Sequence, residues 1–205
     1  MKKSLIAFFI LVSLFAFSKT IHIKADFVKP SDERIEYSGS VVLKIEEENF
    51  TLNADNLIVK KLSGKWRITE ASSSVTVTLE DGELKGDTLI YDVETRVGTI
   101  TGNVKGEFID KTSTETIYIE CEQITFDLEE DVFQGAGKVK IQKGSVEANS
   151  EEVVYKRKDG IIELLRSVRL KDKEKDLEME AERVVMDLEE DTMEASSVTV
   201  TLEVE

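Results

Sequence analysis

A short motif recurs six times along this chain, and it constrains the fold more than any other feature of the sequence. Each copy consists of a small residue, an acidic residue and, two positions further on, an apolar residue. The small residues are Ala25, Ala54, Gly86, Cys121, Ser150 and Ala181, and 29 to 35 residues separate neighbouring copies. A second landmark, two small or polar residues followed by Val, comes after each copy: Gly39-Ser40-Val41, Ser73-Ser74-Val75, Gly102-Asn103-Val104, Gly137-Lys138-Val139, the looser Arg166-Ser167-Val168, and Ser196-Ser197-Val198. Self-similarity at a nearly fixed period is the signature of a repeat architecture, so we expect six structural units.

Each copy lies on a stretch of alternating apolar residues that slips by one position at the motif. Ile117, Ile119 and Cys121 alternate, and the alternation resumes out of phase at Ile124 and Phe126. Period-2 alternation indicates a half-buried strand. A slip of one residue would turn every later side chain to the opposite face unless a bulge or corner absorbs it. The stretch is therefore predicted to be a bent strand whose two arms face the same way, with the acidic residue at the bend pointing outward.

The whole of residues 19–205 is expected to form one β domain. Val, Ile, Thr, Tyr and Phe recur with period 2 and are separated by turn signals such as Asp81-Gly82 and Asp159-Gly160. With two strands in each of six units, we predict about 12 to 14 strands. The acidic runs 127–131 and 187–191 occupy equivalent positions in their repeats, where turns are expected.

Residues 1–18 have the pattern of a secretory leader. Lys2 and Lys3 precede an apolar core at 5–17, and Ala16-Phe17-Ser18 is a small-x-small cleavage site. The apolar core is short for a membrane span, which needs about 20 residues. We expect cleavage after Ser18 and export of the remainder, with retention of the segment as an anchor left as the alternative.

Charge and composition argue against several classes of function. Without Lys2 and Lys3, residues 19–205 hold 25 basic and 42 acidic residues, and such an acidic chain is a poor partner for nucleic acid. His22 is the only histidine and Cys121 the only cysteine, so no catalytic base pairs with a nucleophile and no disulfide forms within the chain. Zinc-ligand spacing and calcium-loop motifs are absent from the sequence. We predict no enzyme activity, no cofactor and no metal site.

The repeat unit resembles that of a known family. Gly86-Asp87-Thr88-Leu89-Ile90-Tyr91-Asp92, followed by Gly102-Asn103-Val104, is similar to the unit of the OstA/LptA family, which includes the N-terminal domain of LptD. The resemblance extends over 19–205. It implies a twisted β-jelly roll, that is, a folded, V-shaped antiparallel sheet, in a periplasmic protein. It also implies an interior that takes the acyl chains of lipopolysaccharide, head-to-tail assembly through the terminal strands, and envelope transport proteins as partners.

The residues and the resemblance together predict a non-enzymatic periplasmic protein that carries lipopolysaccharide or a similar amphiphilic lipid towards the outer membrane. The residues expected to contact the lipid are the inward positions of the bent strands: Phe50, Leu52, Leu57, Val59, Leu89, Tyr91, Ile117, Ile119, Ile124, Phe126, Val153, Tyr155, Met179, Val184 and Met186. Two alternatives stay open. One is a β-scaffold that polymerises in the envelope without lipid, and the other is a membrane-tethered relay component of the same pathway.

Overall fold

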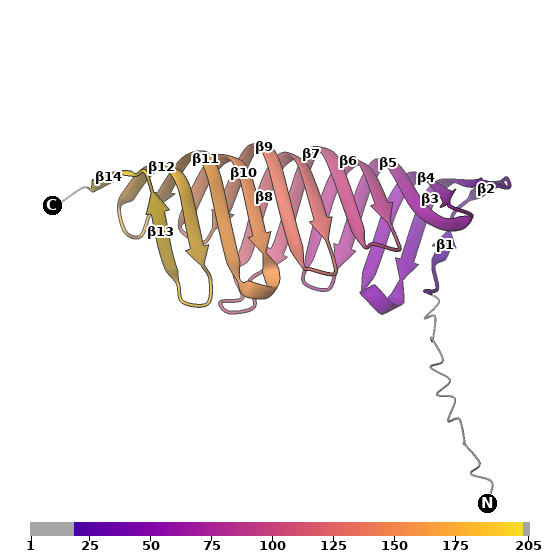
Figure 1. The fold of residues 1–205 in the computed structure, drawn as a ribbon, viewed down its shortest axis with the longest axis horizontal. Coiled ribbons are helices and arrows are strands. Elements are labelled where there is room, and N and C mark those ends of the chain that lie inside the picture. The colour runs from indigo at the N-terminus through magenta and orange to yellow at the C-terminus, as the bar shows by residue number, and fades with distance from the viewer. Residues whose placement is uncertain (1–18, 203–205) are drawn as a thin grey trace, which may run out of the picture.

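A computed structural model describes residues 19–202 as one antiparallel sheet of 14 strands (Figure 1). The strands are β1 (His22–Lys24), β2 (Phe27–Pro30), β3 (Arg34–Ile45), β4 (Phe50–Leu62), β5 (Lys65–Leu79), β6 (Gly82–Asp92), β7 (Val97–Ile109), β8 (Thr116–Asp127), β9 (Val132–Lys143), β10 (Val146–Lys156), β11 (Ile161–Asp172), β12 (Leu177–Asp187), β13 (Thr192–Ser196) and β14 (Thr199–Leu202). Two short 3₁₀ turns, η1 (Glu46–Glu48) and η2 (Arg157–Asp159), lie in hairpin connections. The strands from β3 to β13 follow one another in order as a meander.

Every long strand is bent in its middle, where the pairing register shifts. In β8, for example, the pairing with β9 skips from Glu120 to Gln123 and so passes over the Cys121-Glu122 motif. Opposite each motif, the second landmark adopts a left-handed backbone. The residues with positive φ at these bends are Gly39, Ser40, Ser73, Ser74, Gly102, Asn103, Gly137, Lys138, Arg166, Ser167 and Ser197. Paired left-handed residues turn the strand through a corner and account for the slipped residue.

The acidic residues of the motif lie outside the bend, as predicted. All six, namely Asp26, Asp55, Asp87, Glu122, Glu151 and Glu182, are exposed, while the small residues before them are buried or half-buried. In three units the acid packs against a glycine. A Cβ on Gly102 would lie 2.2 Å from Oδ2 of Asp87, and one on Gly137 would lie 2.6 Å from Oε2 of Glu122. Glycine is needed at these corners both for its positive φ and for the close approach of the acid.

Replacing Gly102 with Ala should destabilise the fold. Its φ of +85° is unfavourable for an L-residue, and the added methyl group must displace Asp87. We expect a loss of about 1–3 kcal/mol in the free energy of unfolding, measured by urea denaturation. Ser73→Gly, at the equivalent corner with a φ of +67°, is the matched control and should retain wild-type stability or exceed it. A neutral Gly102→Ala would contradict this account of the corners.

The bends divide the sheet into two half-sheets that face each other. Half-sheet A contains β1, β14 and the strand portions 41–45, 50–54, 75–79, 82–86, 104–109, 116–121, 139–143, 146–150, 168–172 and 177–181. Half-sheet B contains β2, β13 and the portions 34–38, 56–62, 65–72, 88–92, 97–101, 123–127, 132–136, 152–156, 161–165 and 183–187. In Figure 1 the strands fold over along the upper side of the view and the hairpin turns lie along the lower side. We call this lower side, where two rows of turns meet, the mouth.

The core lies between the two half-sheets along the full length of the molecule. Its residues are the inward positions of both arms, and each half-sheet contributes a continuous set of Val, Leu, Ile and aromatic side chains. The V-shaped antiparallel sheet and the strand number are therefore as predicted. The acidic runs also form turns, because the carboxylate of Asp127 accepts hydrogen bonds from the backbone N–H groups of Glu129 and Glu130, at 2.9 and 3.1 Å. Asp187 does the same with Glu189 and Glu190.

The predicted leader, residues 1–18, and its cleavage site after Ser18 lie outside the described residues. Within residues 19–202, no helix has the length and apolar character that crossing a membrane requires.

Candidate functional site

The residues expected to contact lipid all lie on the inner surface of the folded sheet. Fourteen of the fifteen are buried, with exposed fractions between 0 and 6 %, and Met179 is half-buried. They come from the even-numbered strands β4 to β12. The inward direction of the bent arms is therefore correct, but these side chains fill the space between the half-sheets instead of lining an open trough.

A row of aromatic rings fills the interior near the mouth. Phe50 of half-sheet A stacks on Tyr91 of half-sheet B, with ring centroids 4.7 Å apart, and Tyr91 is followed by Phe126 at 6.0 Å. Phe126 is followed by Phe133 at 6.3 Å. The next residue of the row, Phe108, belongs to half-sheet A and contacts two residues of half-sheet B, Phe133 at 4.7 Å and Tyr155 at 5.5 Å. Such pairs add about 0.5–1.5 kcal/mol each beyond the burial of their area. The row therefore joins the two half-sheets at two places, through Phe50 and through Phe108, and closes the middle of the mouth.

At the N-terminal end of the mouth, a buried carboxylate connects the two rows of turns. Glu48 in η1 has a side chain only 3 % exposed, and its Oε2 accepts a hydrogen bond of 2.7 Å from the hydroxyl of Tyr91. Its Oε1 lies 3.3 Å from Nε of Arg96, in the opposite row, and 2.5 Å from Nζ of Lys19. Lys19 also donates to the carbonyl of Val93 at 2.9 Å. Oε1 is within ion-pair distance of both cations, but it accepts no hydrogen bond of good geometry.

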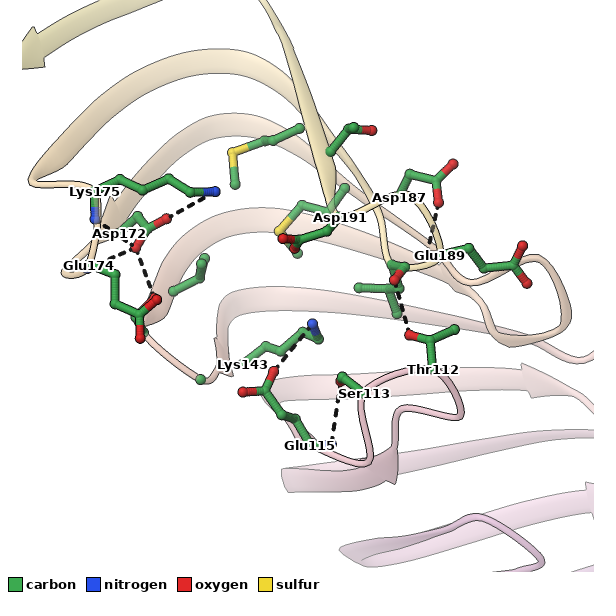
Figure 2. Close-up of a pocket in the computed structure, with 17 residues that line it drawn as sticks. Thr112, Ser113, Glu115, Lys143, Asp172, Glu174, Lys175, Asp187, Glu189 and Asp191 are labelled. Atoms are coloured by element: carbon green, nitrogen blue, oxygen red, sulfur yellow. Dashed lines mark hydrogen bonds and ion pairs between the residues drawn. The ribbon is translucent and has the colours of Figure 1, made fainter.

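The mouth opens beyond the aromatic row, towards the C-terminal end of the molecule. A pocket of about 490 Å³ lies there between the turns of half-sheet A and the β12–β13 turn (Figure 2). The Thr112 hydroxyl donates to the carbonyl of Leu188 at 3.0 Å and so bridges the two sides within the pocket. The apolar part of the lining is Val146, Met186, Leu188 and Met193. Met186 and Leu188 belong both to the core and to the lining of this pocket, so the pocket adjoins the inner surface of the sheet.

The rim of the pocket is rich in carboxylates, and the buried Asp110 lies behind it, bonded to the lining residues Thr112, Ser113 and Lys143. Burial raises the pKa of Asp110, but this effect is outweighed by the hydroxyl of Ser113, the N–H and hydroxyl of Thr112 and the ammonium of Lys143, which hold the pKa at about 2. Lys143 is itself largely buried and lies 3.3 Å from Oδ2 of Asp110 and 3.3 Å from Oε2 of Glu115. The pocket therefore has a mostly charged and polar lining in which four apolar residues, Val146, Met186, Leu188 and Met193, are set.

Asp110→Asn should weaken the fold at neutral pH and reduce its sensitivity to acid. Because the pKa of Asp110 falls from an ordinary value of 3.8 to about 2 on folding, its ionised form stabilises the protein above pH 4, and this contribution is lost as the pH falls through 2. We expect the variant to lose about 2 kcal/mol at pH 7. Thermal unfolding between pH 7 and 2 measures the effect, and a variant that loses stability in parallel with the wild type across this range would contradict it.

Burial raises the pKa values of titratable side chains in the interior above the range of acid–base chemistry at neutral pH. Burial raises the pKa of the Cys121 thiol to about 11 and the pKa of the Tyr155 hydroxyl to about 12, so both stay protonated near neutral pH. Residues 19–202 contain no group of three or more His, Cys, Asp or Glu side chains placed to hold a metal ion. The arrangement is that of an apolar surface enclosed between two sheets.

Several residues of this site are not among those expected from the sequence. Phe108 and Phe133 lie on odd-numbered strands, and their alternation with neighbouring apolar residues was a signal that could have identified them. Glu48, Arg96 and Lys143 lie in or next to turns, where no repeat position distinguishes them from other charged residues.

Comparison with known proteins identifies two matching families. The profile of the LptA/(LptD N-terminal domain) LPS transport protein family matches residues 22–132, and that of the lipopolysaccharide-assembly, LptC-related family matches residues 94–173. No curated protein matches the chain significantly. The crystal structure of LptH, the LptA homologous periplasmic component of the conserved lipopolysaccharide transport device from Pseudomonas aeruginosa, is similar with a TM-score of 0.30 and 8 % sequence identity, over 90 % of this chain and 96 % of that chain.

Proposed function

The chain belongs to the family of LptA and LptD N-terminal-domain lipopolysaccharide transport proteins, and from this premise we propose that its interior holds the acyl chains of lipopolysaccharide during transport through the periplasm. The protein is a non-enzymatic periplasmic component of lipopolysaccharide transport.

The observation that supports this proposal is a continuous apolar interior with an opening at one end. The core runs the length of the molecule between half-sheets A and B, and every bent strand contributes to it. Transfer of acyl chains from water to such a surface is favourable by about 25 cal/mol per Å². Because the interior is filled in the described state, acyl chains bind by separating the half-sheets and replacing the contacts between them.

The pocket at the C-terminal end of the mouth is the first place where lipid would contact the interior. Met186 and Met193 line it, and their unbranched, flexible side chains adapt to a ligand of variable shape. Met186 belongs to the set expected to contact lipid, and we propose that the rest of that set, from Phe50 to Val184, is reached as the half-sheets part.

Met186→Asp provides the test. The substitution places a charge among the four apolar residues of the pocket. It should abolish the binding of purified lipopolysaccharide. Binding is measured by the change in fluorescence of an acyl-chain probe that the lipid displaces from the protein. Glu190→Gln, in the exposed turn that follows β12 and outside the pocket lining, is the control that should bind normally. Undiminished binding by a folded Met186→Asp protein would refute this location.

The two ends of the sheet suit head-to-tail assembly. At the N-terminal edge, Phe27 and Val28 of β2 are 73 % and 60 % exposed, and at the C-terminal edge Val198 and Val200 are 44 % and 47 % exposed. Unpaired strands with exposed apolar residues recruit other strands. We propose that copies add end to end and continue the interior, and that other transport proteins use the same edges. Analytical ultracentrifugation over a range of protein concentrations should show oligomers. A monomer at every concentration would contradict the proposed end-to-end assembly.

A second candidate is a relay component tethered to the membrane. It is favoured by the LptC-related match over residues 94–173 and depends on whether residues 1–18 are retained. N-terminal sequencing of the exported protein distinguishes the two roles, because a chain that starts at Lys19 is not tethered by this segment.

A further inference from the structure

Few polar contacts hold the mouth closed, and most of them lie around Glu48 at its N-terminal end. Most ion pairs within residues 19–202 join residues of the same half-sheet or residues along a bend. Among these residues, only the ion pair Glu48–Arg96 joins a turn of half-sheet A to a turn of half-sheet B. The Tyr91 hydroxyl makes a second contact to the same carboxylate. The hydrogen bond from Thr112 to Leu188 joins the two rows of turns near the other end.

The contacts of the Glu48 carboxylate with the opposite half-sheet exist only while the mouth is closed. Its side chain is 3 % exposed, so its charge is removed from water and must be compensated by neighbouring groups. Those groups, Arg96 and Tyr91, lie on the opposite half-sheet, and Lys19 comes from the start of the described chain. If the half-sheets separate, Glu48 loses these partners but regains water. The exchange makes the contact reversible, as a latch requires.

The latch also adjoins the aromatic row. Tyr91 both donates to Glu48 and stacks between Phe50 and Phe126. Its hydroxyl therefore connects the polar contact across the mouth to the apolar packing inside it. Releasing Glu48 frees the hydroxyl end of Tyr91, the second ring of the row, and this ring is then held only by its contacts with Phe50 and Phe126.

We propose that Glu48, with Arg96 and Tyr91, is the latch that keeps the mouth of the folded sheet closed, so that the population of open molecules is set by this contact. The role of the latch in lipid uptake rests on the proposed function, but the closure itself does not. The latch is a built-in control of access to the interior and lies at the end of the mouth opposite the pocket.

Cys121 provides a reporter of opening that needs no engineering. It is the only cysteine of the chain and is 7 % exposed, and its Sγ donates to the carbonyl of Gln123 at 3.1 Å on the inside of a bend. Cys121 also borders a shallow pocket on the outside of the bend, so exposure of the interior is read from the change in its rate of reaction with an aromatic disulfide reagent between variants that share this outer route. Opening of the mouth exposes less surface than global unfolding does, so reaction through this opening depends less steeply on urea concentration, and the two routes are distinguished by their urea slopes.

The test compares Glu48→Gln with Glu47→Gln, its exposed neighbour. Glu48→Gln keeps the shape of the side chain and removes its charge. We expect Cys121 to react about tenfold faster in this variant, with a urea slope shallower than that of global unfolding, because hydrogen bonds to a charged group are among the stronger ones. Arg96→Gln should give the same result without altering the half-sheet A turn, and Glu47→Gln should react like the wild type.

Two results would overturn the latch. One is an unchanged Cys121 rate in both Glu48→Gln and Arg96→Gln, and the other is an increase that follows global unfolding at every urea concentration. Because this assay contains no lipid, it stands apart from the proposed function: a latch that opens in a protein that binds no lipopolysaccharide would refute only the function.

Discussion

Phe126→Ala is expected to lower the free energy of unfolding by about 3–5 kcal/mol, the largest effect on stability that we anticipate from a single truncation in this protein. The Phe126 ring is fully buried in the aromatic row and contacts the rings of Tyr91 and Phe133. Its removal leaves a cavity between the half-sheets and interrupts the row at its centre. Urea denaturation followed by tyrosine fluorescence measures the loss.

Gly98 allows a control specific to this site. The Phe126 ring lies directly on Gly98, where an added Cβ would be 2.3 Å from Cζ of the ring. Gly98→Val alone should therefore destabilise the protein by overpacking, by about 1–3 kcal/mol. In the double variant Phe126→Ala/Gly98→Val, the valine fills part of the space left by the ring. The loss in the free energy of unfolding should therefore be smaller than the sum of the losses in the two single variants. Strict additivity would show that the ring and the glycine do not share this space.

Cross-linking the mouth is expected to abolish the loading of lipid. With Cys121 replaced by Ala, cysteines introduced by Glu48→Cys and Arg96→Cys face each other across the mouth, where the native side chains lie 3.3 Å apart. A short bis-maleimide then ties the half-sheets together. Before cross-linking, the variant lacks the latch and should take up lipopolysaccharide readily. After cross-linking, it should take up none, because the half-sheets no longer separate.

The same protein treated with a monofunctional maleimide is the control, since it carries the same chemical modification without the tether. Uptake measured by displacement of an acyl-chain probe should be normal in this control. If the cross-linked protein loads as well as the control, the acyl chains reach the interior without parting the mouth, and the opening mechanism is wrong.

Much of the fold could be predicted because each bend leaves a local signature. The slip in alternation at Cys121-Glu122 identifies a bent strand, and the buried positions from Ile117 to Phe126 follow from it directly. The pair Gly102-Asn103 was recognised as a landmark, but its left-handed backbone was not. The reason is that, apart from Gly39 and Gly137, the residues at the other corners are serine, lysine or arginine, which seldom adopt positive φ.

The closed state of the interior could not be predicted from the alternation. The pattern specifies which way a side chain points, but not whether the facing side chain is long enough to meet it. Contacts such as Glu48 with Arg96 depend on how two turns 48 positions apart come together, and no repeat position marks them. The place of the pocket does have a sequence correlate: the inward residue that is Tyr91, Phe126 and Tyr155 in successive units becomes Met186 in the last one.

The central claim is that the interior between the half-sheets carries an acylated lipid, and native mass spectrometry of the protein purified from its own envelope tests it most directly. The account predicts a mass increment that extraction identifies as an acylated glycolipid, and that is lost in Met186→Asp. A protein that is free of lipid and forms a ladder of oligomers would contradict the account and favour a structural scaffold of the envelope.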